Sequence, residues 1–105
     1  MLKGILIKTT GEIKVVEYED TLETLQGFVD GYIDYVTIED GIDMIINDEG
    51  KIRGMEPNWV ATYLYGVPDI IVGDALVVGV ENGENITLTD EQIDMIIKRA
   101  ESEEI

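Results

Sequence analysis

Hydrophobic and polar residues alternate over the first part of the chain in a way that is typical of antiparallel strands. Two segments rich in Ile and Val, residues 2–8 and 12–18, are separated by Thr-Gly at 10–11, which predicts a β-hairpin. Asp20 follows, with Glu23 three positions later, a spacing typical of a capping box. We therefore expect a short helix directly after the first hairpin.

A second alternating segment covers residues 31–39 and is followed at once by Asp-Gly at 40–41. This dipeptide is a strong hairpin signal, because both turn positions would take a positive φ, and residues 42–46 would form the return strand. Asn-Asp-Glu-Gly at 47–50 predicts a type I turn that leads into a strand at 51–53. We expect these pieces to form a three-stranded meander.

The second half of the chain predicts two helices around one long strand. Pro57 suits a first helical turn, and apolar residues recur at helical spacing over 59–64. Residues 70–80 are almost continuously apolar, which indicates a central strand. Thr89 and Gln92 have the spacing of a capping box for a final helix.

These elements predict one α+β domain over residues 1–105, with residues 101–105 as a frayed acidic tail. We expect a single twisted, mainly antiparallel sheet of six to seven strands, with two to three helices on one face. A chain of this length is large enough to bury a single core.

The composition excludes several kinds of chemistry. The chain has no histidine and no cysteine, so it offers no imidazole base, no thiol nucleophile and no zinc site of the Cys/His type. The one serine, Ser102, lies in the acidic tail. We therefore expect a protein that is not an enzyme and that carries no metal or cofactor.

The formal net charge of −16 bears on the choice of partner. Such a surface repels nucleic acid and anionic membranes and favours a host protein with a basic surface, although the charge alone could simply keep the protein soluble. No segment has the length of a membrane span and no signal peptide is evident, and with no cysteines the expected location is the cytoplasm. A homo-oligomer is compatible with the sequence.

The turn at residues 47–50 and the basic residues after it form the first candidate site. It would present Asn47 and Glu49 beside Lys51 and Arg53, which could together recognise one carboxylate or phosphate. Alternatively, the asparagine and glycine of this turn serve only its geometry.

The helix after Pro57 carries the second candidate site. Asn58, Trp59, Thr62 and Tyr63 could line a cleft for a planar ligand. Alternatively, Trp59, Val60, Tyr63 and Leu64 recur at helical spacing and could belong to the core. Asp74 interrupts the long apolar strand after a glycine, so that either a bulge aims it outward or it anchors a network near Asn58 and Thr62.

Two tyrosines mark a third candidate surface. Tyr32 and Tyr35 alternate with Asp30 and Asp34 on a predicted strand, a combination that suits an interface with a basic protein. The alternative is a half-buried strand whose rings cover the edge of the sheet.

Four motifs taken in order resemble a known family. They read L-Q-G-F-V-D-G-Y-I-D-Y-V from residue 25, N-D-E-G-K from 47, P-N-W-V-A-T from 57 and D-I-I-V-G-D-A-L-V-V-G from 69. This series resembles domain of unknown function 3846, a small family of phages and mobile elements. The resemblance implies a fold and a genomic setting but no chemistry.

From these features we expect a small acidic phage or mobile-element protein that binds and occludes a host factor, in host takeover or counter-defence. In one version its carboxylates imitate the phosphates of a nucleic acid. The alternatives are a module that sequesters a small ligand or nucleotide signal, and an enzyme that uses Glu49 and Asp74 as paired carboxylates.

Overall fold

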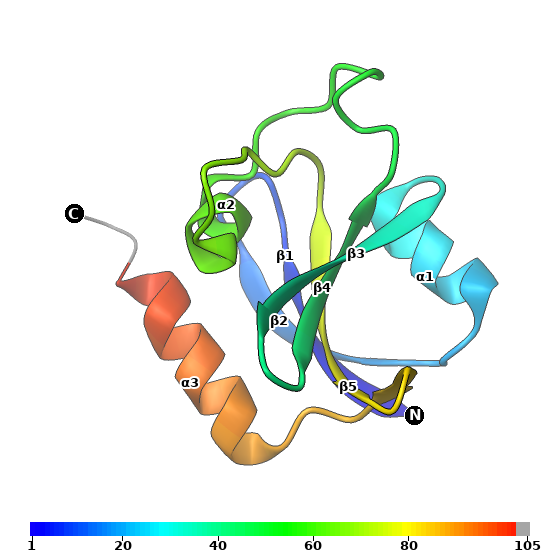
Figure 1. Cartoon of the computed structure of the whole chain (residues 1–105), viewed down its shortest axis with the longest axis vertical. Coiled ribbons are helices and arrows are strands. Elements are labelled where there is room, and N and C mark those ends of the chain that lie inside the picture. Colours follow the sequence, from blue (N-terminus) through cyan, green and yellow to red (C-terminus); the bar gives the residue numbers. More distant parts are fainter. Residues whose placement is uncertain (103–105) are drawn as a thin grey trace.

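The computed structural model describes residues 1–102, which form one six-stranded antiparallel sheet and three helices (Figure 1). The elements in chain order are β1 (Leu2–Ile7), β2 (Ile13–Tyr18), α1 (Leu22–Val29), β3 (Ile33–Glu39), β4 (Ile42–Asn47), α2 (Trp59–Tyr65), β5 (Ala75–Glu81), β6 (Glu84–Ile86) and α3 (Asp90–Glu101). The predicted α+β class and strand number are confirmed. None of the helices in this part of the chain is long and apolar enough to cross a membrane.

The strand order is β2-β1-β5-β4-β3, with β6 paired to the end of β5. The central position predicted for the long apolar strand is therefore confirmed, because β5 pairs with β1, β4 and β6. Both β2 and β3 lie at edges of the sheet.

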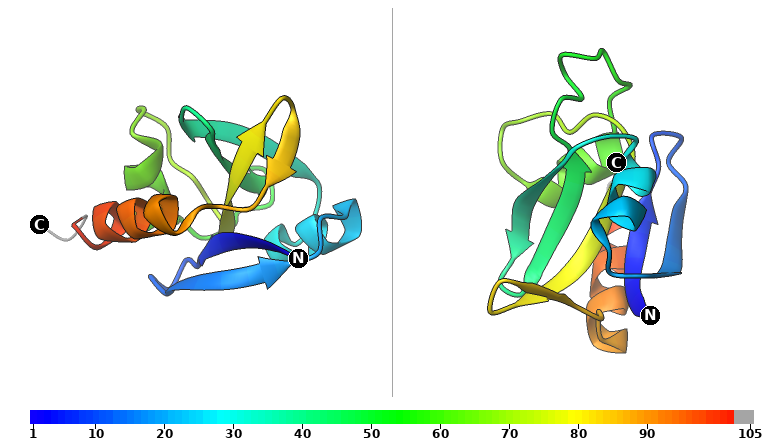
Figure 2. Two further views of the ribbon diagram at one scale, coloured as in Figure 1. Left: turned by 90° about the horizontal axis from the view of Figure 1, so that it is seen from below. Right: turned by 90° about the vertical axis from the view of Figure 1, so that its right-hand side faces the viewer.

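Helices cover both faces of the sheet, so the prediction of helices on one face only was wrong. Successive residues of β1 show why: Ile5 and Ile7 pack into one core cluster with α2 and α3, and Leu6 packs into another with α1. Figure 2 shows the helices on either side of the sheet. A strand buried on both faces needs apolar residues at every position, as β5 has at Ala75 to Val78.

The predicted hairpins are present, with a difference at one turn. At the β5–β6 turn both Asn82 and Gly83 have positive φ, 52° and 79°. At the β3–β4 turn only Gly41 does, at 82°, and the register shifts between Thr37 and Glu39. The β3–β4 turn keeps the predicted two residues, since Glu39 pairs with Ile42, but only one of them has a positive φ. The extra residue is a bulge within β3, between Thr37 and Glu39.

Two predicted strand segments are absent from the structure. Residues 51–53 form turns, so the meander has two strands instead of three. The strand predicted at residues 70–80 begins only at Ala75, because Gly73 has a φ of 80° and its amide donates to the Glu56 carbonyl oxygen. Before that point the chain makes only an isolated bridge, Pro57 to Val72.

The predicted helix caps are present, except that the cap of α1 lies one residue later than predicted. The α1 helix is capped by Thr21, whose hydroxyl accepts from the Thr24 amide at 3.2 Å, and not by Asp20. The capping box of Thr89 and Gln92 on α3 is confirmed. Of the predicted tail, Glu101 closes α3 and Ser102 caps it, while residues 103–105 lie outside the described chain.

Tyr18 is buried in the core, packed edge-on against Phe28, and its hydroxyl has no hydrogen-bond partner among the described residues. An unpaired buried hydroxyl costs free energy that a phenyl ring avoids. We expect Tyr18→Phe to raise the free energy of unfolding by about 1 kcal/mol, measured by urea denaturation.

The pKa of Tyr18 gives this prediction a pH dependence. Burial, and then the charges of Asp20 and Tyr35, raise this pKa well above its ordinary value. Above about pH 10 the unfolded chain releases the phenol proton while the folded protein keeps it, so wild-type stability falls as the pH rises. The advantage of Tyr18→Phe should widen above that pH, and a gap of constant size would contradict the burial argument.

Candidate functional site

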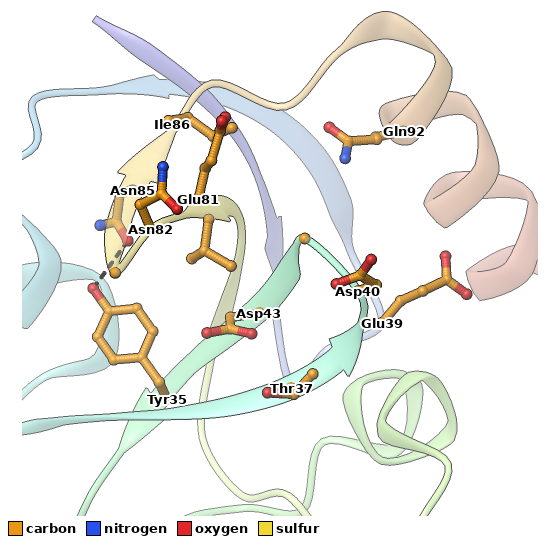
Figure 3. A pocket seen from close by; sticks show the side chains of 13 residues that line it. Tyr35, Thr37, Glu39, Asp40, Asp43, Glu81, Asn82, Asn85, Ile86 and Gln92 are labelled. Atoms are coloured by element: carbon orange, nitrogen blue, oxygen red, sulfur yellow. Dashed lines mark hydrogen bonds between the residues drawn. The ribbon is translucent and has the colours of Figure 1, made fainter.

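A groove of about 880 Å³ lies between the β3–β4 and β5–β6 hairpins (Figure 3). Tyr35 and Thr37 of β3 line one wall, and Glu81 and Asn82 line the opposite wall. Gln92, from the first turn of α3, contributes at one end. A volume of this order can hold a ligand or a short peptide segment.

The groove is acidic. Its lining includes Glu39, Asp40, Asp43 and Glu81 and contains no lysine or arginine. Arg99 of α3 donates to the carboxylate of Glu39 at 3.0 Å and neutralises one charge at the rim. The remaining carboxylates make the groove attractive to cations and repulsive to anions.

A chain of hydrogen bonds fixes one end of the groove. The Tyr35 hydroxyl donates to Asn85 Oδ1 at 3.1 Å, and Asn85 Nδ2 donates to Asp20 Oδ1 at 2.9 Å. These contacts tie the β5–β6 hairpin to β3 and to the segment before α1. The β6 wall is therefore held in place by side chains from two other segments.

The residues of the first site predicted from sequence do not lie together in one site of the structure. Asn47 is buried, and its Nδ2 donates to the carbonyl oxygens of Val29 and Asp30 at 3.0 and 3.1 Å. Its Oδ1 accepts from the Glu49 amide at 2.7 Å. Asn47 therefore joins the end of α1 to the turn after β4, and it has no free polar group for a ligand.

The two basic residues of that site, Lys51 and Arg53, line separate pockets. Lys51 lines a hollow of about 180 Å³ and hydrogen-bonds the Asp69 carboxylate, which lowers the pKa of Asp69 below its ordinary value. Arg53 lines another of about 340 Å³ with Glu49 and Tyr32, and it pairs with Asp30 at 3.0 Å. Each of the two cations therefore pairs with its own carboxylate, an arrangement that does not favour the single anion site predicted for both.

The second predicted site is a structural network and not a cleft. Asn58 has no exposed surface; its Nδ2 donates to the carbonyl oxygens of Ile7 and Gly73, both at 2.9 Å. Its Oδ1 accepts from the Ala61 amide at 3.1 Å and so caps α2. Thr62 Oγ1 donates to the Asn58 carbonyl oxygen at 2.8 Å and accepts from the Ile71 amide at 2.9 Å.

Asp74 lies apart from this network. Its Oδ1 accepts from the Thr9 amide at 3.0 Å, so it holds the turn between β1 and β2. The backbone irregularity predicted at Gly73 is present, but the carboxylate is partly buried. Glu49 lines the hollow around Arg53, so the two carboxylates of the enzyme hypothesis have separate roles.

The aromatic residues of α2 point outward. Trp59 is 56% exposed and Tyr63 is 41% exposed, whereas Val60 and Leu64 of the same helix are buried. The core interpretation is correct for Val60 and Leu64 only. Of the tyrosines of the third site, Tyr32 is 65% exposed beside Arg53, and Tyr35 faces the groove.

The sequence did not identify the carboxylates of the groove. Asp40, Asp43 and Glu81 come from two hairpins, and the sequence carried only the turn signals of those hairpins. Across residues 1–102 no group of three or more aspartates and glutamates is arranged so that it could hold a metal ion.

Comparison with known proteins gives a family for this chain. Residues 2–101 match the family described as Domain of unknown function (DUF3846), and the chain belongs to it. No curated protein and no solved structure matches the chain.

Proposed function

We propose that this member of the DUF3846 family is a non-enzymatic binding protein that engages a basic host protein through the acidic groove between its two hairpins. In the setting that we infer, the protein is encoded by a phage or mobile element and acts in the host cytoplasm. It would occlude the surface that the host factor uses, in host takeover or counter-defence.

The observation that carries the proposal is the groove lined by Glu39, Asp40, Asp43 and Glu81 without a lysine or arginine in its lining. A concave acidic surface on a protein of net charge −16 speeds the encounter with a basic partner. Tyr35 supplies an aromatic anchor of the kind found at interface hot spots.

The alternative of a nucleotide-binding module has less support. An anionic ligand needs free cations, and Lys51 and Arg53 both pair with carboxylates of the protein. The groove between the two hairpins presents carboxylates instead. A thermal-shift screen with nucleotides tests this alternative, since a ligand at a hundredfold excess over its Kd adds about 2.7 kcal/mol of stability.

The test of the proposal is affinity capture from a host lysate with the wild-type protein and a groove variant. We expect wild type to retain a basic protein at about 0.1 M salt and to release it near 1 M, where the Debye length falls from about 10 Å to about 3 Å. The variant Asp40→Asn/Asp43→Asn/Glu81→Gln should lose this capture, because it removes three charges from the groove lining.

A matched control separates the groove from overall charge. Glu17→Gln/Glu19→Gln/Glu23→Gln removes the same number of charges from exposed positions that do not line the groove. We expect this control to capture the partner as well as wild type does. Equal losses in the two variants, or capture that resists high salt in both, would show that the groove is not the binding site.

A further inference from the structure

One edge of the sheet runs along the acidic groove. In the described chain β3 pairs only with β4, and it lies at the margin of the sheet in the right-hand view of Figure 2. The side chains of Tyr35 and Thr37 on this strand line the groove. One wall of the groove is therefore an edge strand whose outer side is unpaired in the described chain.

The hydrogen bonding of β3 shows which backbone groups are free. The Asp48 amide donates to the Tyr32 carbonyl oxygen at 2.9 Å, so Ile33 and its partner Asn47 form a non-hydrogen-bonded pair. Because hydrogen-bonded and non-hydrogen-bonded pairs alternate in an antiparallel ladder, the amides and carbonyls of Ile33, Tyr35 and Thr37 point away from β4. These outward groups can pair with another strand.

One of these outward amides already donates a hydrogen bond to a side chain of the same strand. The Tyr35 amide donates to Oδ1 of the neighbouring Asp34 at 2.9 Å. The carboxylate thus occupies the place that the carbonyl oxygen of an added strand would take. The contact confirms independently that this amide points away from β4.

We propose that the basic partner enters as an extended segment bearing Lys or Arg, which adds a strand to the free edge of β3 and lays alternate side chains along the acidic groove. The inference rests on the proposed function and specifies its partner. Main-chain hydrogen bonds supply affinity in this mode of recognition, and the alternate side chains supply specificity.

The charges along the edge strands indicate which kind of segment would bind and at which edge of the sheet. On the groove side an added strand would lie beside Glu39 of β3, with Asp43 of β4 opposite Thr37, and these carboxylates favour Lys or Arg in the added strand. A second copy of this chain would place the same carboxylates opposite one another, which is unfavourable. Of the other edge strands in the described chain, β2 carries Lys14 and contributes no residue to the groove, and β6 is only three residues long.

Fluorescence anisotropy with synthetic peptides tests the inference. The probe is a labelled ten-residue peptide of alternating Lys and Val, and two further versions are N-methylated on all Lys or on all Val residues. Since the amides of alternate residues point to opposite sides of a strand, methylation of one set should abolish binding and methylation of the other should be tolerated.

Two proline substitutions give the matching test on the protein. Thr37→Pro removes an amide that points away from β4, at an edge position where proline is compatible with a strand. Val15→Pro removes an amide that points away from β1 on the edge strand β2, which does not line the groove. We expect Thr37→Pro to weaken binding of the unmethylated peptide by about tenfold or more and Val15→Pro to leave it close to wild type.

Each outcome bears on the inference. If both methylated peptides bind as well as the parent, or if both lose binding equally, strand addition is overturned. The groove proposal then still stands, provided that the parent peptide binds and the groove variant loses it. If the parent peptide does not bind at all, the inference is overturned, and the lysate capture decides the proposed function separately. Should Thr37→Pro fail to fold, the comparison of the two methylated peptides decides alone.

Discussion

Asn58→Ala is expected to lower the free energy of unfolding by about 3–5 kcal/mol, enough to unfold a marginal domain. The Asn58 amide donates to two carbonyl oxygens, of Ile7 in β1 and of Gly73 before β5, and its oxygen caps α2. Alanine would leave both carbonyl groups buried without a partner and would remove the cap. Urea denaturation followed by circular dichroism measures the loss.

Thr21→Ala provides the matched control for this prediction. Thr21 is also the N-cap of a helix, but it is exposed and its hydroxyl bonds only with Thr24. Its loss should cost about 1 kcal/mol, the value of a cap alone. If Asn58→Ala cost no more than Thr21→Ala, the two buried carbonyl contacts would contribute nothing, contrary to expectation.

The contacts of Asn58 also explain one motif of the family resemblance. In N-W-V-A-T the asparagine caps the helix, Ala61 is fully buried, and Thr62 connects α2 to Ile71. In N-D-E-G, Asn47 joins α1 to the turn, and a Cβ at Gly50 would lie 2.7 Å from Val72 Cγ2. These contacts favour a role of both motifs in folding over a binding site that the two motifs would share.

The parts of the fold that sequence could predict depend on local geometry. Asn82-Gly83 specifies a tight turn by itself, since both residues have the positive φ that such a turn requires. Thr89 and Gln92 likewise cap α3 through contacts within four residues. The start of the long apolar strand was predicted too early in the chain, because the backbone at Gly73 is held by Glu56, a residue far from it in the sequence.

The candidate site could not be predicted from sequence, because it also depends on contacts between residues that lie far apart in the chain. Its carboxylates become neighbours only after β3, β4 and β5 have paired and the β5–β6 hairpin has been tied to Tyr35. In contrast, Asn58 and Asp74 can be identified in the sequence as polar residues among apolar ones. In the structure their side chains form hydrogen bonds with the backbone. A buried polar residue is evidence of a hydrogen-bond requirement before it is evidence of a ligand.

Gly4→Ala is expected to lower the free energy of unfolding by about 1–3 kcal/mol, even though alanine favours a strand more than glycine does. A Cβ at Gly4 would lie 2.8 Å from the Val77 carbonyl oxygen and 3.0 Å from Tyr18 Cε1. The carbonyl belongs to the central strand β5, so it cannot rotate away, and the Tyr18 ring is enclosed in the core. The entropic gain of about 0.4–1 kcal/mol from replacing glycine is too small to offset this clash.

Gly27→Ala in α1 should have the opposite sign and serves as the control for Gly4→Ala. No heavy atom lies within 4 Å of a Cβ placed at Gly27, and this glycine is in the interior of the helix. The substitution should therefore raise the free energy of unfolding by about 0.5–1 kcal/mol, because glycine weakens a helix by that amount relative to alanine. Urea midpoints that move in opposite directions would support both predictions. Stabilisation by Gly4→Ala would instead mean that β1 and β5 can separate enough to admit a methyl group, which the pairing of Ile5 with Val77 argues against.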